Sequence, residues 1–143
     1  MTDALHALGD RLVGTWTTEA THPAFPGAVV AGSGRFEWLE GERFLIHRSH
    51  YDHPDIPDAI SIFGDTGGLH MHYFDSRGVH RVYALTVGAD GWTLLMDRAG
   101  DAPFAQRMTH TLAPGDATIA GKGQLSYDDT SWEDDLEIIY LRT

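Results

Sequence analysis

The chain has 143 residues, carries a formal net charge of −11 from 10 basic and 21 acidic side chains, and contains no cysteine. This length predicts a single domain over residues 1–143. A surface this acidic repels phosphate backbones and anionic lipid, so we expect neither nucleic acid nor a membrane as a partner. A chain without cysteine has no disulfides, thiol nucleophiles or cysteine-ligated metals. The opening residues lack the basic segment and apolar run of a signal peptide, which predicts a cytoplasmic protein.

A short helix is expected at the start of the chain. Thr2 or Asp3 can cap it, and Gly9 within the pattern keeps it brief. Its apolar positions recur at helical spacing and are Leu5, Leu8 and Leu12. After Gly14 the apolar period changes from helical spacing to two, which is typical of strands with one buried face.

Ten further segments show this alternation, and Gly-, Asp- and Pro-rich turns separate most of them. The predicted strands are Thr15–His22, Val30–Glu40, Arg43–Asp52, Ala59–Phe63, Leu69–Asp75, His80–Val87, Trp92–Arg98, Phe104–Leu112, Thr118–Ser126 and Trp132–Arg142. Strands with one apolar face bury that face in a sandwich or a closed barrel. Short connections favour an all-β, antiparallel, up-and-down barrel of about ten strands after the N-terminal helix.

The last strand shows the alternation clearly. One side carries apolar or aromatic residues and the other carries acids. The first set is Trp132, Leu136, Ile138 and Tyr140, and the second is Glu133, Asp135 and Glu137. The longest irregular pieces, His22–Gly27 and His53–Asp58, each hold two prolines, so we expect loops there that form the mouth of the barrel.

The segment after the helix resembles a known superfamily. Gly14, Thr15 and Trp16 are similar to the Gly-x-Trp opening of calycins, which include lipocalins, fatty-acid-binding proteins and nitrobindins. Residues 34–45 and 73–78 resemble a bacterial family of calycin-like barrels. The resemblance covers nearly the whole chain. It implies a closed or nearly closed ten-strand barrel that holds a small, mostly apolar ligand.

Strand alternation also predicts which side chains line the barrel. The apolar lining is predicted to be Trp16, Phe36, Trp38, Ile46, Met71, Trp92, Met96, Met108 and Ile138. The polar lining is predicted to be Arg48, His50, Tyr73, Arg81, Tyr83, Gln106, His110 and Tyr140. Segment 43–52 fits either orientation, because it carries apolar residues on both sides. Phe44 and Ile46 share one side with Arg48 and His50, whereas Leu45 and Tyr51 share the other side with His47 and Ser49. We assign Arg48 and His50 to the inside.

Apolar walls with a few polar groups are typical of small-molecule sites. The first functional hypothesis is therefore binding of a small, largely apolar or weakly anionic molecule inside the barrel. An arginine inside the barrel needs a counter-charge, from a ligand carboxylate or from Asp75. The competing structural interpretation places such arginines and histidines near the rim, with their charged ends in water. The sequence does not distinguish a monomer from a homodimer.

The second hypothesis is a cofactor-independent isomerase, cyclase or lyase. His50 or His110 would act as base, Tyr73 or Tyr83 as proton donor, and Arg48 or Arg81 would polarise an anionic group.

The third hypothesis is haem binding, which the resemblance to nitrobindins implies through a histidine near the C-terminus. This chain has no histidine after His110, and its final strand offers Tyr140 instead. His70 and His72 share a strand face, but that face is predicted to be the outer one, which favours solvated side chains over a metal site. We therefore expect no cofactor and no metal.

Overall fold

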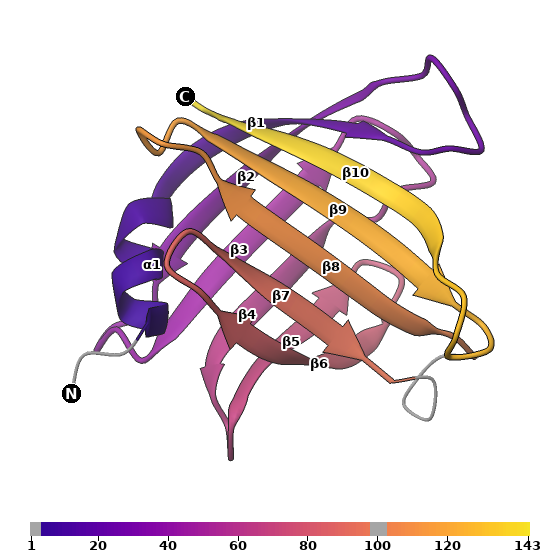
Figure 1. Ribbon diagram of the computed structural model, residues 1–143. Coiled ribbons are helices and arrows are strands. Elements are labelled where there is room, and N and C mark those ends of the chain that lie inside the picture. Colours follow the sequence, from indigo (N-terminus) through magenta and orange to yellow (C-terminus); the bar gives the residue numbers. More distant parts are fainter. Residues whose placement is uncertain (1–3, 98–102) are drawn as a thin grey trace.

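The computed structural model describes residues 4–97 and 103–143. Within these ranges the chain forms one helix and ten strands (Figure 1). They are α1 (Ala4–Leu12), β1 (Gly14–Thr21), β2 (Val30–Trp38), β3 (Phe44–Tyr51), β4 (Ala59–Asp65), β5 (Leu69–Asp75), β6 (His80–Val87), β7 (Gly91–Met96), β8 (Ala105–Leu112), β9 (Thr118–Ser126) and β10 (Glu133–Arg142). The predicted cap at Thr2 or Asp3 and the predicted strand end at Arg98 lie outside the described residues. No helix in the described part is long and apolar enough to cross a bilayer.

The strands close into an antiparallel barrel. Each strand pairs with its neighbours in the sequence, and β1 pairs with β10 to complete the ring. At that seam Trp16 lies opposite Arg142 and Thr21 opposite Glu137. The predicted all-β, up-and-down barrel with a short N-terminal helix is therefore confirmed.

The interior is filled by alternate residues of the strands, as the two-residue period requires. Trp16, Phe36, Leu45 and Ile119 are almost completely buried. Helix α1 covers one end of the barrel (Figure 1). Its leucines pack into the same core. Burying a leucine contributes about 1.5–3 kcal/mol relative to exposure, so three of them hold this short helix in place.

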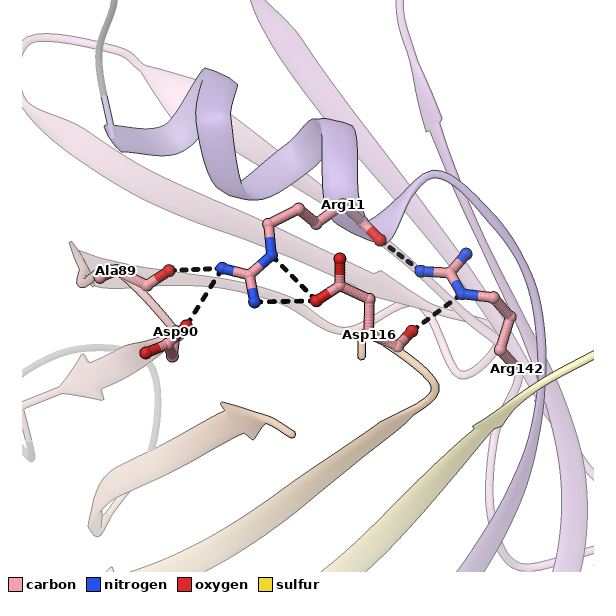
Figure 2. A network of polar contacts seen from close by, with 5 residues as sticks. All are labelled: Arg11, Ala89, Asp90, Asp116 and Arg142. Atoms are coloured by element: carbon pink, nitrogen blue, oxygen red, sulfur yellow. Dashed lines mark hydrogen bonds and ion pairs between the residues drawn. The ribbon is translucent and has the colours of Figure 1, made fainter. Parts of the chain in front are cut away.

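A network of two arginines seals the helix end (Figure 2). The Arg142 guanidinium stacks on Trp16 with its carbon 4.1 Å from the ring centroid, and it donates to the backbone oxygens of Asp116, Val13 and Arg11. The Arg11 side chain donates to the Asp116 carboxylate at 2.8 and 3.1 Å and to the Ala89 carbonyl at 2.7 Å. Helix α1, two turns and the last strand are thus joined at this end, which leaves the opposite end as the mouth.

The predicted orientation of β3 is wrong. Leu45, His47, Ser49 and Tyr51 point into the barrel, whereas Ile46, Arg48 and His50 point outward. In register, His47 lies opposite the buried Phe36 of β2, so the two side chains share the inner face. The Arg48 and His50 side chains each expose 56% of their surface and bind acids on the outside.

The alternation at the start of β10 is also interrupted. The register against β9 shifts between Asp134 and Glu137, which marks a β-bulge. Trp132, predicted to share a face with Tyr140, instead stacks against the Arg107 guanidinium at 4.2 Å on the outer face. Asp135 is drawn partly inward, where it pairs with His22 at 2.8 Å.

Candidate ligand-binding site

A cavity of about 220 Å³ lies inside the barrel, and we call it the interior cavity. Its wall combines side chains from six strands with three residues of the mouth loops. The lining is His47, Ser49 and Tyr51 of β3; Ala59, Ser61 and Phe63 of β4; Met71 and Tyr73 of β5; Trp92 and Leu94 of β7; Gln106, Met108 and His110 of β8; Leu136, Ile138 and Tyr140 of β10; and Ile56, Pro57 and Arg77 from the loops.

Two histidines of this wall are held by aromatic stacking. The His47 ring stacks on Phe36 with centroids 4.1 Å apart, and the His110 ring stacks on Trp92 at 4.4 Å. Tyr140 lies near both, at 5.9 Å from His47 and 6.2 Å from His110. The planes of both imidazoles are thus fixed by packing, which pre-orients their nitrogen atoms.

Three buried polar atoms on the cavity wall make no hydrogen bond within the described protein. They are Nε2 of His47, Nδ1 of His110 and Nε1 of Trp92. More than about 90% of buried polar groups are paired in folded proteins, and an unpaired one costs about 1–3 kcal/mol. All three belong to residues that line one cavity, but each atom is itself covered by neighbouring protein atoms, so a molecule inside the cavity reaches it only when the wall shifts slightly.

Both histidines are neutral at physiological pH. Burial lowers the pKa of His47 to about 4. Burial, with a smaller contribution from nearby His47, lowers the pKa of His110 to about 3. A neutral imidazole carries one donor and one acceptor nitrogen, so each ring can serve either role toward a bound group.

The phenols around the cavity are also neutral. Burial raises the pKa of Tyr51 to about 12 and raises that of Tyr140 well above its ordinary value, with Tyr51 adding to the latter shift. Tyr73 has a raised pKa from burial and from its bond to Asp75, to which its hydroxyl donates at 2.8 Å. These residues are hydrogen-bonding groups without charge at neutral pH.

The charged groups of this site lie at its rim. Arg77 binds the Asp75 carboxylate at 2.6 Å, and this bond holds the Asp75 pKa well below its usual range. Asp75 thus neutralises Arg77, not Arg48 or Arg81 as the sequence suggested. The guanidinium of Arg81 lies over Phe104, with its carbon 5.5 Å from the ring centroid, and is not part of the cavity wall.

The structure brings part of the predicted lining together. Met71, Tyr73, Trp92, Gln106, Met108, His110 and Tyr140 all line the interior cavity. Tyr83 and Met96 are buried but do not line it, and the Tyr83 hydroxyl donates to Gln106. Trp38 packs at the helix end instead, where its ring nitrogen donates to Asp10 at 2.9 Å.

His47, Ser49, Tyr51 and Ser61 are lining residues that sequence reasoning missed. Glycines at inward positions of the neighbouring strands are the signal that identifies the histidine positions. A Cβ on Gly34 would lie 3.2 Å from Nε2 of His47, and one on Gly121 would lie 3.0 Å from Cδ2 of His110. Each glycine leaves the space that an imidazole occupies.

The histidines outside the barrel and the size of the cavity bear on the metal and haem hypotheses. His70 and His72 lie on the outer face, with both rings near Thr66. The one grouping of possible metal ligands in the described residues is His6, Asp10 and Glu42, at the helix end. The interior cavity is smaller than the roughly 300–1,000 Å³ typical of sites for drug-sized ligands.

Comparison with known proteins supports the fold. Neither a protein-family model nor a curated protein sequence matches the chain. The crystal structure of Rv2717c from M. tuberculosis is similar, with a TM-score of 0.69 and 16% identity over 100% of this chain and 99% of that one. A redesigned β-barrel, mFAP1 bound to DFHBI, matches with a TM-score of 0.49 and 11% identity over 95% of this chain and 99% of that one. At such identities the likeness to Rv2717c concerns the fold alone.

Proposed function

We propose that this protein binds a small molecule in the interior cavity, as a calycin-like barrel. The observation that carries the proposal is the set of unpaired polar atoms on His47, His110 and Trp92 around that cavity. Fixed polar groups in an otherwise apolar wall are what orient a bound molecule in a small-molecule site. The Gly14–Trp16 opening and the barrel topology support the family assignment.

The wall also bounds the size of the molecule. Phe63, Met71, Leu94 and Ile138 supply apolar surface, and the enclosed space is about 220 Å³. A ligand that stays wholly inside must therefore be small.

A cavity-filling substitution tests this proposal. Ser61 is buried, lines the cavity and lies between His47 and Tyr73 in the strand register. Ser61→Phe should fill the space and abolish binding of a fluorescent fatty-acid probe, as well as any small molecule seen by native mass spectrometry of the isolated protein. Ser33→Phe places the same ring on the outer face and should change neither result. A folded Ser61→Phe protein that binds as the wild type does, or a wild type that binds nothing, would contradict the proposal.

A cofactor-independent enzyme is the second candidate, favoured by the proximity of His110 and Tyr140. Acid–base groups work best with pKa values near the working pH. The histidine pKa values near 3 and 4, the Tyr51 pKa of about 12 and the raised Tyr140 pKa are all far from neutrality. We therefore rank binding first. For any substrate that is turned over, His110→Gln should abolish turnover and largely spare affinity if His110 is the base.

A further inference from the structure

We propose that the ligand is an uncharged amphiphile. Its hydrogen-bonding head lies against His47 and His110, and its apolar part extends past Ile56 and Leu136 into a second pocket at the barrel mouth. This inference rests on the binding function proposed above and specifies the class of molecule.

The second pocket, which we call the mouth pocket, has a volume of about 390 Å³. It is lined by the ends of β1, β2 and β10 and by the two proline-containing loops. The lining is Ala20, Thr21, His22, Phe25, Ala28, Val30, His53, Asp55, Ile56 and Leu136. Ile56 and Leu136 also line the interior cavity, so the two spaces adjoin and these two side chains stand between them.

The mouth pocket offers an apolar surface without an apolar partner. Phe25 exposes 68% of its surface, the largest exposure among the large hydrophobic residues of the described chain. Its ring makes a tilted contact with His22 at 6.2 Å. An apolar chain leaving the interior between Ile56 and Leu136 would meet Ala28, Val30 and Phe25. Covering this surface is favourable in proportion to the apolar area removed from water.

The polar end of the site favours a head without charge. His47 and His110 are neutral, and so are the phenols of Tyr51, Tyr73 and Tyr140 that face them from β3, β5 and β10. These groups can donate and accept hydrogen bonds but cannot compensate a buried charge, which is costly when unpaired.

The charged groups that line the two spaces have partners or are acidic. Arg81 of β6, which lies opposite Tyr73 in register and has a buried Nε without a partner in the described protein, stands outside the lining with its guanidinium over Phe104. Arg77 binds Asp75 at 2.6 Å, and His22 binds Asp135 at 2.8 Å. At the mouth, His53 accepts a hydrogen bond from the backbone of Asp55, whose carboxylate adds negative charge. Among the described residues that line the two pockets, no arginine or lysine is left to bind a carboxylate. An anionic ligand that contacts only this lining, and not Arg81 behind it, would therefore have to take up a proton on binding.

Octanamide and octanoate test this directly, because they share size and shape and differ in charge. Calorimetric titration of the wild-type protein from pH 6 to pH 8 should give a constant affinity for octanamide. Octanoate should bind about a hundredfold more weakly at pH 8 than at pH 6, because uptake of one proton makes affinity fall tenfold per pH unit. Octylammonium should bind more weakly than octanamide throughout.

The outcomes separate this inference from the binding function. If octanoate binds at pH 8 as tightly as octanamide, with no pH dependence, the uncharged head is wrong, and loss of that binding in Ser61→Phe would leave the cavity function standing. If only the fatty-acid probe binds, the ligand class is again wrong. If octanamide binds Ser61→Phe as well as it binds the wild type, the interior cavity is not the site, and both proposals fall.

Two variants locate the two ends of the ligand. His110→Phe keeps the stack on Trp92 but removes the ring nitrogens, and should weaken octanamide about tenfold. Phe25→Ala should weaken octanamide several-fold but leave propanamide, which is too short to reach the mouth pocket, unchanged. Phe74→Ala, on the outer face of β5, is the control and should affect neither. Equal effects of Phe25→Ala on both amides, or none on octanamide, would overturn the placement of the apolar part.

Discussion

At the scale of single residues, His47 and His110 show how the interior differs from an ordinary core. Each ring is stacked on an aromatic side chain, and each keeps a buried nitrogen without a partner in the described protein. A leucine at either position would fill similar space without the cost of an unpaired polar atom. The two imidazoles therefore weaken the fold in a way that binding a polar group can offset.

This cost should appear in the dependence of stability on pH. Both folded-state pKa values lie below the ordinary histidine value of 6.5, at about 4 for His47 and about 3 for His110. Between pH 6.5 and pH 4 the unfolded chain thus binds more protons than the folded one, so stability falls as the pH falls through this range. Each unit of pKa shift corresponds to about 1.4 kcal/mol, so the free energy of unfolding should drop by several kcal/mol.

Urea unfolding at several pH values measures this drop. His110→Phe should flatten the decline between pH 6.5 and pH 4. His50→Gln is the control, because Asp58 and Asp52 raise the His50 pKa, so its contribution is present at low pH and lost as the pH rises. An unchanged slope in His110→Phe would show that this ring is not protonated on unfolding.

At the scale of elements, helix α1 depends on one close contact with β2. Gly9 is buried in the helix, and a Cβ there would lie 2.4 Å from Cζ2 of Trp38. Trp38 in turn stacks on His6 at 5.1 Å and donates to Asp10 at 2.9 Å. The indole therefore occupies the space that a side chain at position 9 would need.

Gly9→Ala should consequently destabilise the protein, although alanine is the better helix former. The gain in helix propensity is about 1 kcal/mol, whereas overpacking costs about 1–3 kcal/mol and the displaced indole also loses its bond to Asp10. In a Trp38→Leu background the clash is removed and the same substitution should stabilise. Thermal unfolding of the wild type, the two single variants and the double variant gives the coupling free energy between positions 9 and 38. Additive effects of the two substitutions would contradict the proposed contact.

The elements also show what the sequence could and could not predict. The strands follow from the two-residue period, and for β5, β7 and β8 one face is plainly more apolar, so their inward residues were predicted correctly. Strand β3 has apolar residues on both faces, so its orientation depends on pairing with the glycines and Phe36 of β2. The bulge in β10 gives no compositional signal, and the cavity volume depends on how side chains from six strands pack.

At the scale of the whole molecule, one end of the barrel is closed and the other carries the proposed ligand entrance. The helix end is closed by leucines and by the network of Arg11 and Arg142 (Figure 2). The opposite end carries the loops that line the mouth pocket. The proposed binding site and the seal are thus separated along the barrel axis, so a change at the seal should alter stability more than ligand affinity.

Arg142 is the residue on which this separation can be tested. Its guanidinium stacks on Trp16 and donates to three backbone oxygens, which a lysine cannot reproduce. Arg142→Ala should lower the free energy of unfolding by about 2–4 kcal/mol, because charged hydrogen bonds contribute about 1.5–3 kcal/mol each and water replaces part of the loss. Arg142→Lys should fall between this variant and the wild type. Arg35→Ala, on the exposed face of β2, should change stability by less than about 0.5 kcal/mol.

Urea unfolding of each variant measures the free energy of unfolding, and octanamide titration of the same variants measures ligand affinity. Unchanged stability in Arg142→Ala, or a loss of affinity in a variant that remains folded, would show that the helix end does not act as a seal independent of the site.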